Sequence, residues 1–123
     1  IQLSGEKQHT VHSAVVLANS LEKASLVIFT AGGVLANHAT QQRPVHADIF
    51  AFCPDEEVMR SLLMNRAVTP FFLEMADHPD DNIRRAIDLL KENGFVEAGN
   101  PLVILSDILH RDFDTEAILL RKA

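Results

Sequence analysis

Short runs of β-branched and aromatic residues alternate along this chain with segments of helical spacing, and this alternation restricts the fold more than any other feature. The runs are apolar on both faces, as expected of strands that helices cover on either side. Strands that alternate with helices of about 8–15 residues indicate βαβ units and a mostly parallel sheet. The predicted strands are residues 26–29, 46–52, 68–73 and 102–105.

The helical segments are recognised by an apolar stripe and by their ends. The first is predicted from His9, with Thr10 or a neighbour as its cap and residues 1–8 as a loose lead-in. Its stripe is Val11, Ala14, Val15, Ala18 and Leu21.

Three further helices are predicted between the strands. The second spans 34–41 and stops before Arg43-Pro44. The third begins at 54–57, where proline and acids suit a helix start, and its apolar face is Val58, Met59, Leu62 and Leu63. The fourth opens at 77–81, carries Ile83, Ile87 and Leu90 on its stripe, and ends at Gly94 as a left-handed cap.

A fifth strand is predicted at residues 118–121. The link from 106 to 117 is too short and too polar for a helical crossover, so we expect an antiparallel edge strand. The prediction is an α/β fold: a three-layer α/β/α sandwich around a mostly parallel five-stranded sheet whose last strand is antiparallel. We treat residues 1–123 as one domain, because their number fits a single domain.

Composition excludes several classes of partner. Eleven basic and seventeen acidic residues give a net charge of −6, which argues against nucleic acid and against an anionic membrane surface. No apolar run approaches the roughly 20 residues that span a bilayer, and no signal-peptide pattern is present. The single Cys53 lies in an apolar run and is interpreted as a buried small hydrophobe. These features favour a cytoplasmic protein.

The carboxyl ends of the strands are where ligands bind in open α/β sheets, so the segments that follow them are candidate sites. They are 30–33, 73–75 and 106–108. The first joins a strand to a helix through Gly32-Gly33, where backbone N–H groups and the helix N-terminus favour an anion. From the two glycines alone, a tight strand-to-helix turn with nothing bound is the favoured interpretation.

No metal site or catalytic constellation emerges from the spacing. The six histidines form no metal-binding motif, and the acids at 77–81 are interpreted as helix-capping residues. Asp107, Asp112, Asp114 and Glu116 are interpreted as a solvated acidic loop without calcium-loop spacing. We therefore expect no catalytic residue, no metal and no cofactor in this chain.

Several strings in a fixed order resemble the C-terminal domain of pyruvate kinase. The string 14–19 with 26–30 resembles its opening helix and strand, and Thr30-Ala31-Gly32-Gly33 followed by Arg43-Pro44 resembles its T-x-S-G…R-P spacing. Residues 66–70 resemble R-G-V-x-P, and 91–100 resemble K-x-x-G-x-x-x-x-G-D. The resemblance covers about residues 9–123, nearly the whole chain.

The resemblance implies the same five-stranded fold and a regulatory role. In pyruvate kinases, phosphoryl transfer from phosphoenolpyruvate to ADP, with Mg and K ions, takes place in a separate barrel domain that nothing here resembles. What the resemblance implies for this chain is binding of a phosphorylated metabolite effector, homo-oligomer formation, and contact with the barrel domain of a parent enzyme of glycolysis.

The sequence departs from effector-regulated members at the effector pocket. Only Thr30 keeps a hydroxyl in the phosphate loop, and the arginine that some members carry in the fourth helix falls at Asn82, with Arg84 and Arg85 pointing elsewhere. The last loop supplies acids. We expect a degenerate pocket, and an alternative remains a stand-alone α/β domain that binds a small molecule or nucleotide. The effector or anion-binding candidates are Thr30, Ala31, Gly32, Gly33, Ser106 and Arg84.

Overall fold

Five strands form a single sheet in the order β3-β2-β1-β4-β5. The computed structural model describes residues 5–30, 32–41, 47–65, 67–106 and 117–123. Neighbouring strands are parallel except β4 and β5, which are antiparallel. The antiparallel fifth strand predicted from the link length is therefore confirmed. The strands are β1 (Ser25–Phe29), β2 (Asp48–Cys53), β3 (Val68–Phe72), β4 (Pro101–Ser106) and β5 (Ala117–Lys122).

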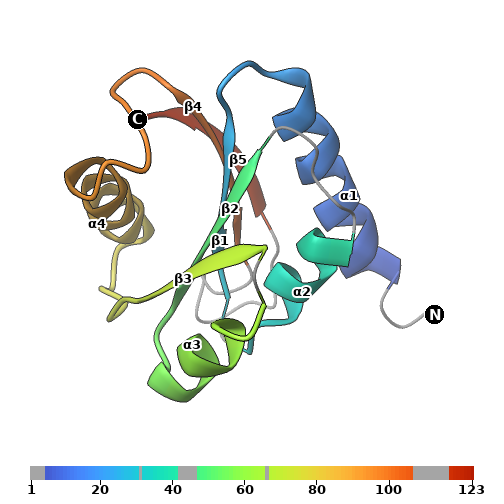
Figure 1. The fold of residues 1–123 in the computed structure, drawn as a ribbon, viewed down its shortest axis with the longest axis vertical. Coiled ribbons are helices and arrows are strands. Elements are labelled where there is room, and N and C mark those ends of the chain that lie inside the picture. The colour runs from blue at the N-terminus through green and yellow to red at the C-terminus, as the bar shows by residue number, and fades with distance from the viewer. Residues whose placement is uncertain (1–4, 31, 42–46, 66, 107–116) are drawn as a thin grey trace.

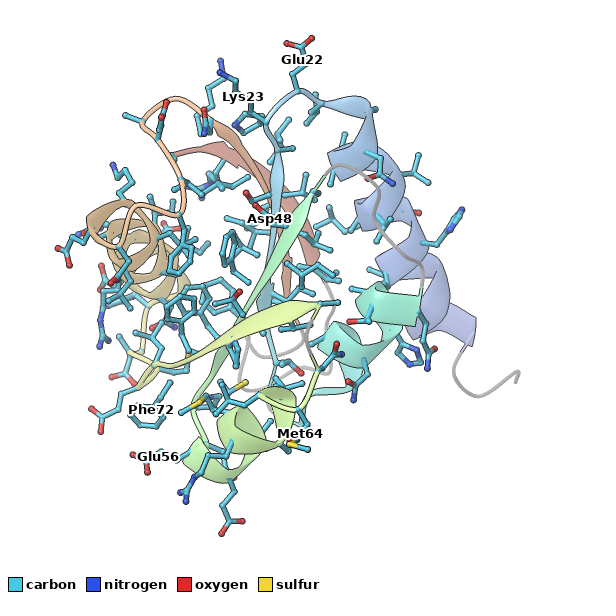
Figure 2. The ribbon with its side chains drawn as sticks, in the orientation of Figure 1. Glu22, Lys23, Asp48, Glu56, Met64 and Phe72 are labelled. Atoms are coloured by element: carbon cyan, nitrogen blue, oxygen red, sulfur yellow. The ribbon has the colours of Figure 1, made fainter. Side chains whose placement is uncertain are left out.

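Helices cover both faces of the sheet, so the predicted three-layer sandwich is confirmed. Figure 1 shows α1 (Gly5–Ser20), α2 (Val34–Gln41) and α3 (Glu56–Leu62) on one side and α4 (Pro79–Glu92) on the other. The four parallel strands, β1 to β4, start at the end of the molecule where Figure 2 labels Glu22 and Lys23, and the antiparallel β5 ends there. The carboxyl ends of β1 to β4 point toward Glu56 and Phe72.

The two faces of the sheet bury different kinds of side chain. Successive residues of a strand point to opposite faces, so Leu26 and Ile28 pack toward α1 while Val27 and Phe29 pack toward α4. Alanines fill much of the α1 side, which lets helices approach the sheet closely. The α4 side is aromatic, and the Phe52 ring lies 5.5 Å from that of Phe29 and 5.0 Å from that of Phe71.

The start of α1 was predicted too late. The helix begins at Gly5, four residues before His9, so Thr10 lies inside it and is not its cap, and the lead-in predicted over 1–8 is helical from Gly5. The apolar stripe reports only the part of a helix that packs on the sheet. Residues 5–8 carry no apolar side chain, so the stripe gives no signal there.

The ends of the other helices correct two more predictions. Leu63, predicted on the apolar face of α3, follows the last helical residue and is 58% exposed. The N-cap of α4 is His78 rather than an aspartate, and its side chain makes no capping hydrogen bond. Gly94 ends α4 with φ +76°, as predicted for a left-handed cap. The predicted stop at Arg43-Pro44 lies outside the described residues.

The remaining boundaries agree with the sequence analysis. Each strand starts and ends within two residues of its predicted bounds. Asp55 caps α3, with the N–H of Glu57 donating to its Oδ1 at 2.8 Å. Cys53 is buried, as predicted. Among the described helices, none combines the length and the apolar character needed to cross a bilayer.

Candidate functional site

The sheet changes its direction of growth at β1. The chain adds β2 and β3 on one side of β1 and then returns to place β4 on the other. Such a switch point leaves a crevice beyond the carboxyl ends of the two central strands. Here Ser106, at the end of β4, is the register partner of Phe29, the last residue of β1. The structure therefore brings Thr30 and Ser106, from two predicted candidate segments, to the same place.

A local hydrogen bond shapes the turn that follows β1. The N–H of Thr30 donates to the carbonyl oxygen of Phe52 at 3.1 Å, which extends the sheet by one residue. The Thr30 hydroxyl accepts the N–H of Gly33 at 3.0 Å, and this bond is buried. The hydroxyl that the sequence singled out as an anion ligand thus binds its own backbone.

Gly33 is required by its conformation and by its neighbours. Its φ is +84°, where a side chain is strained. A Cβ at this position would lie 3.5 Å from Cγ1 of Val58 and 3.6 Å from Cδ2 of Leu62, both on α3. Gly32 has no such constraint, because its φ is not in that region and its Cβ would meet nothing within 4 Å. Of the two glycines, Gly33 serves the turn and Gly32 does not.

Little of this switch point is open to a ligand. The side chains of Thr30 and Ser106 are fully buried, and Gly33 is buried as well. Among the described residues of the turn only Gly32 is exposed, and the N–H of Gly33 is already used. Ala31 and the acidic loop 107–116 lie outside the described residues. Within the described residues of the turn, the exposed backbone is that of Gly32.

Asn82 has a role that sequence reasoning missed. It is buried on the first turns of α4, and its side chain bonds to both backbone groups of Ala76. The Ala76 N–H donates to Oδ1 at 2.6 Å, and Nδ2 donates to the Ala76 carbonyl oxygen at 3.3 Å. This pair of bonds fastens the segment between β3 and α4 to the helix. The available signal was an amide side chain at the start of a helix, a position where local backbone bonding is common.

Arg84 lies away from these buried groups. Its Nη2 pairs with Oδ1 of Asp81 at 3.2 Å, and it lines a groove between α4 and β5. No hydrogen bond or ion pair joins it to the described residues of the 30–33 turn. The candidate set is therefore divided between two places: Thr30, Gly32, Gly33 and Ser106 at the switch point, and Arg84 in the groove.

The described residues contain no group of three or more His, Cys, Asp or Glu side chains that could hold a metal ion. The acids at the start of α4 are used otherwise. Asp81 pairs with Arg84, and Oδ1 of Asp80 accepts from Nη2 of Arg121 at 3.4 Å. These contacts tie the helix to its own next turn and to β5.

The chain matches a known protein family over most of its length. The family described as the pyruvate kinase alpha/beta domain matches residues 8–118. The chain belongs to this family. The resemblance to the C-terminal domain of pyruvate kinase found in the sequence is thereby confirmed.

Individual relatives agree with this assignment. The chain is 33% identical over 98 residues to "Pyruvate kinase isozyme A, chloroplastic" of Nicotiana tabacum, which covers 80% of this chain and 16% of that one. It is 31% identical over 91 residues to a pyruvate kinase of Lactococcus lactis, and the match covers 74% of this chain and 18% of that one.

A solved structure confirms the fold alone. "Cryptosporidium parvum pyruvate kinase in complex with ADP" superimposes with a TM-score of 0.77 at 24% identity, over 95% of this chain and 23% of that one. The chain thus spans less than a fifth of the two curated relatives and under a quarter of the solved one.

Proposed function

We propose that residues 1–123 form one domain that serves assembly and regulation in a pyruvate kinase-like enzyme of glycolysis. In this proposal a barrel domain carries phosphoryl transfer from phosphoenolpyruvate to ADP with Mg and K ions, and this chain contributes no catalytic residue. The observation that carries the assembly role is the apolar edge of β5, which pairs with no further strand among the described residues. A cytoplasmic location is also part of the proposal, although the relative from Nicotiana tabacum is named as a chloroplastic enzyme.

The exposed apolar residues of β5 lie on the α1 face of the sheet. Leu120 pairs with Val103, and Ile118 pairs with Leu105. Directly paired residues share a face, and both β4 residues belong to the core cluster that α1 covers. Ile118 is 36% exposed and Leu120 is 54% exposed, so α1 covers them only in part.

The outer edge of β5 has no strand partner within the described part of the chain, because β5 is the last strand of the sheet. An open edge beside exposed leucine and isoleucine invites a second strand. A second copy of β5, related by a two-fold axis, can pair antiparallel with the first and cover Leu120 in both copies. This isologous contact is the homo-oligomer interface that we propose.

Sedimentation equilibrium of three proteins tests the interface. We expect the native chain to be dimeric at tens of micromolar, and Leu120→Lys to be monomeric, because a charge on the interface disfavours burial. Leu63→Lys is the matched control and should remain dimeric, since Leu63, the residue after α3, is 58% exposed and Leu120 is 54% exposed. A monomeric native chain, or equal behaviour of the two variants, contradicts the proposal.

The second part of the proposal is that the effector pocket at the switch point is degenerate. Both described hydroxyls, those of Thr30 and Ser106, are fully buried, and the Thr30 hydroxyl already accepts a backbone N–H. Asn82, which stands where some family members carry an arginine, is buried with its amide bonded to Ala76. These observations support a site without the cations that a bisphosphate requires.

Isothermal titration with fructose 1,6-bisphosphate tests this part. We expect no saturable heat that Thr30→Val removes at ligand concentrations up to about 1 mM, so that any binding at the 30–33 turn has a free energy weaker than about −4 kcal/mol. Micromolar binding that is abolished by Thr30→Val but retained by Thr30→Ser would show a working effector pocket instead.

A further inference from the structure

The groove between α4 and β5 gathers positive charge in an acidic chain. It encloses about 360 Å³ and is lined by four of the eleven basic residues of the sequence: Arg84, Lys91, Arg121 and Lys122. Two carboxylates, Asp80 and Asp88, also line it, so the charge of the lining is 4 − 2 = +2. The whole chain carries −6. This local reversal of sign marks the groove as a place where an anion is attracted.

The arginines and the lysines of the groove differ in their ion pairs. The two guanidinium groups are held by acids of the first turn of α4, Arg84 by Asp81 at 3.2 Å and Arg121 by Asp80 at 3.4 Å. Among the described residues no ion pair is formed by Lys91 or Lys122. The arginines are thus oriented before a ligand arrives, and the ammonium groups of the two lysines are not engaged in an ion pair with a described residue.

The walls of the groove are fixed by the fold. Ile83 and Ile87 line it from the helix, and both belong to the packed α4 face of the core. The end of β5 is tied to the loop after α4, because the Ala123 N–H donates to the Asn100 carbonyl oxygen at 2.9 Å. Figure 1 shows this end of the chain, marked C, on the same side of the sheet as α4. A preformed hollow of this volume is within the range of small-ligand sites, about 300–1,000 Å³.

We propose that the α4–β5 groove binds a small phosphorylated metabolite that carries at least two negative charges. Guanidinium groups match phosphate oxygens with two parallel hydrogen bonds, and the ammonium group of Lys91 adds a point charge. The half-buried side chain of Ile87 offers an apolar surface to the carbon part of the ligand. This site is distinct from the 30–33 turn, and it does not depend on the assembly role of β5.

The test is an NMR titration of the 123-residue chain with inorganic pyrophosphate, with backbone amides as reporters. We expect saturable shifts at Arg84, Lys91, Arg121 and Lys122, with a Kd of about 1 mM or tighter. Lys91→Gln should raise that Kd about fivefold, the loss expected for one cation near the ligand. Arg60→Gln, which removes one exposed cation from α3, is the matched control and should leave the Kd within about twofold.

Each other outcome overturns the proposal. Absence of saturable groove shifts up to about 10 mM pyrophosphate shows that the groove is not a site for phosphorylated compounds. Equal weakening by Lys91→Gln and Arg60→Gln shows attraction by net charge alone. Saturable shifts confined to Gly32 and Gly33 place the ligand at the switch point, which would refute the degenerate pocket and leave the dimer untouched. A parallel titration with sodium chloride at equal ionic strength is the control for general salt effects. Equal amide shifts with chloride and with pyrophosphate would show that the groove does not recognise phosphate.

Discussion

Two polar regions of this domain differ in what their polar groups do. The buried set, made of Thr30, Gly33, Asn82 and Ser106, faces the protein, and the hydrogen bonds described for Thr30 and Asn82 serve the backbone. The α4–β5 groove faces solvent and keeps charged groups that no backbone atom uses. Asn82 and Arg84 are two positions apart on α4, yet they belong to opposite regions. Substitutions in the buried set should therefore alter the stability of the domain, and substitutions in the groove should alter ligand binding.

The largest effect is expected at Asn82. Asn82→Ala leaves both the N–H and the carbonyl of Ala76 without their side-chain partner in a partly buried place, and each loss costs about 1–3 kcal/mol. We expect the free energy of unfolding to fall by about 2–4 kcal/mol in chemical denaturation. Asn93→Ala is the control, because that exposed side chain makes one bond to Leu89, and it should cost under about 1 kcal/mol. Equal losses of stability in Asn82→Ala and Asn93→Ala would contradict the structural role assigned to Asn82.

Thr30 is the next test of the buried set. Thr30→Val keeps the shape of the side chain but leaves the buried N–H of Gly33 without its acceptor, so we expect a loss of about 1–3 kcal/mol in the free energy of unfolding. Thr30→Ser retains the oxygen and should recover most of it. If Thr30→Val and Thr30→Ser are equally stable, the hydroxyl does not stabilise the turn. The hydroxyl could then bind a ligand, and the switch point would again be a candidate effector site.

Gly33 and Gly32 form an internal pair of experiment and control. Gly33→Ala forces a side chain into φ +84° and should cost about 1–2 kcal/mol, measured by thermal or chemical unfolding. Gly32→Ala meets no atom within 4 Å and no left-handed backbone, so it should stay within about 0.5 kcal/mol of the native chain. A larger cost at Gly32 than at Gly33 would contradict the role assigned to the turn.

The sequence predicted the sheet well because its signals are local. Apolar runs, Gly94 and the short link before β5 each act within a few residues, and each corresponds to a boundary or a strand direction in the structure. The start of α1 was missed, because a helix turn that contacts no core needs no apolar residue. Leu63 was misplaced, since the end of α3 and not the stripe decides its exposure.

The candidate sites were predicted only in part, for a physical reason. Thr30 and Ser106 could be brought together because both follow strands that end at the same edge of a parallel sheet. The groove was invisible, because its charges come together only when β5 packs beside α4. Asp80 and Arg121 are 41 residues apart in the chain and 3.4 Å apart in the structure. No spacing rule links two such positions.

The smallest effect on stability, and the sharpest test of the difference between the regions, is expected at Arg121. Its ion pair with Asp80 is largely exposed, and such pairs contribute about 0–1 kcal/mol. Arg121→Gln should therefore unfold at nearly the denaturant concentration of the native chain, while its Kd for pyrophosphate rises about fivefold in the NMR titration. Arg60→Gln breaks the equally exposed pair with Glu56 at 3.6 Å and should change neither quantity. If Arg121→Gln lowered the stability and left the Kd for pyrophosphate unchanged, Arg121 would have a structural role and the groove would not be a binding site.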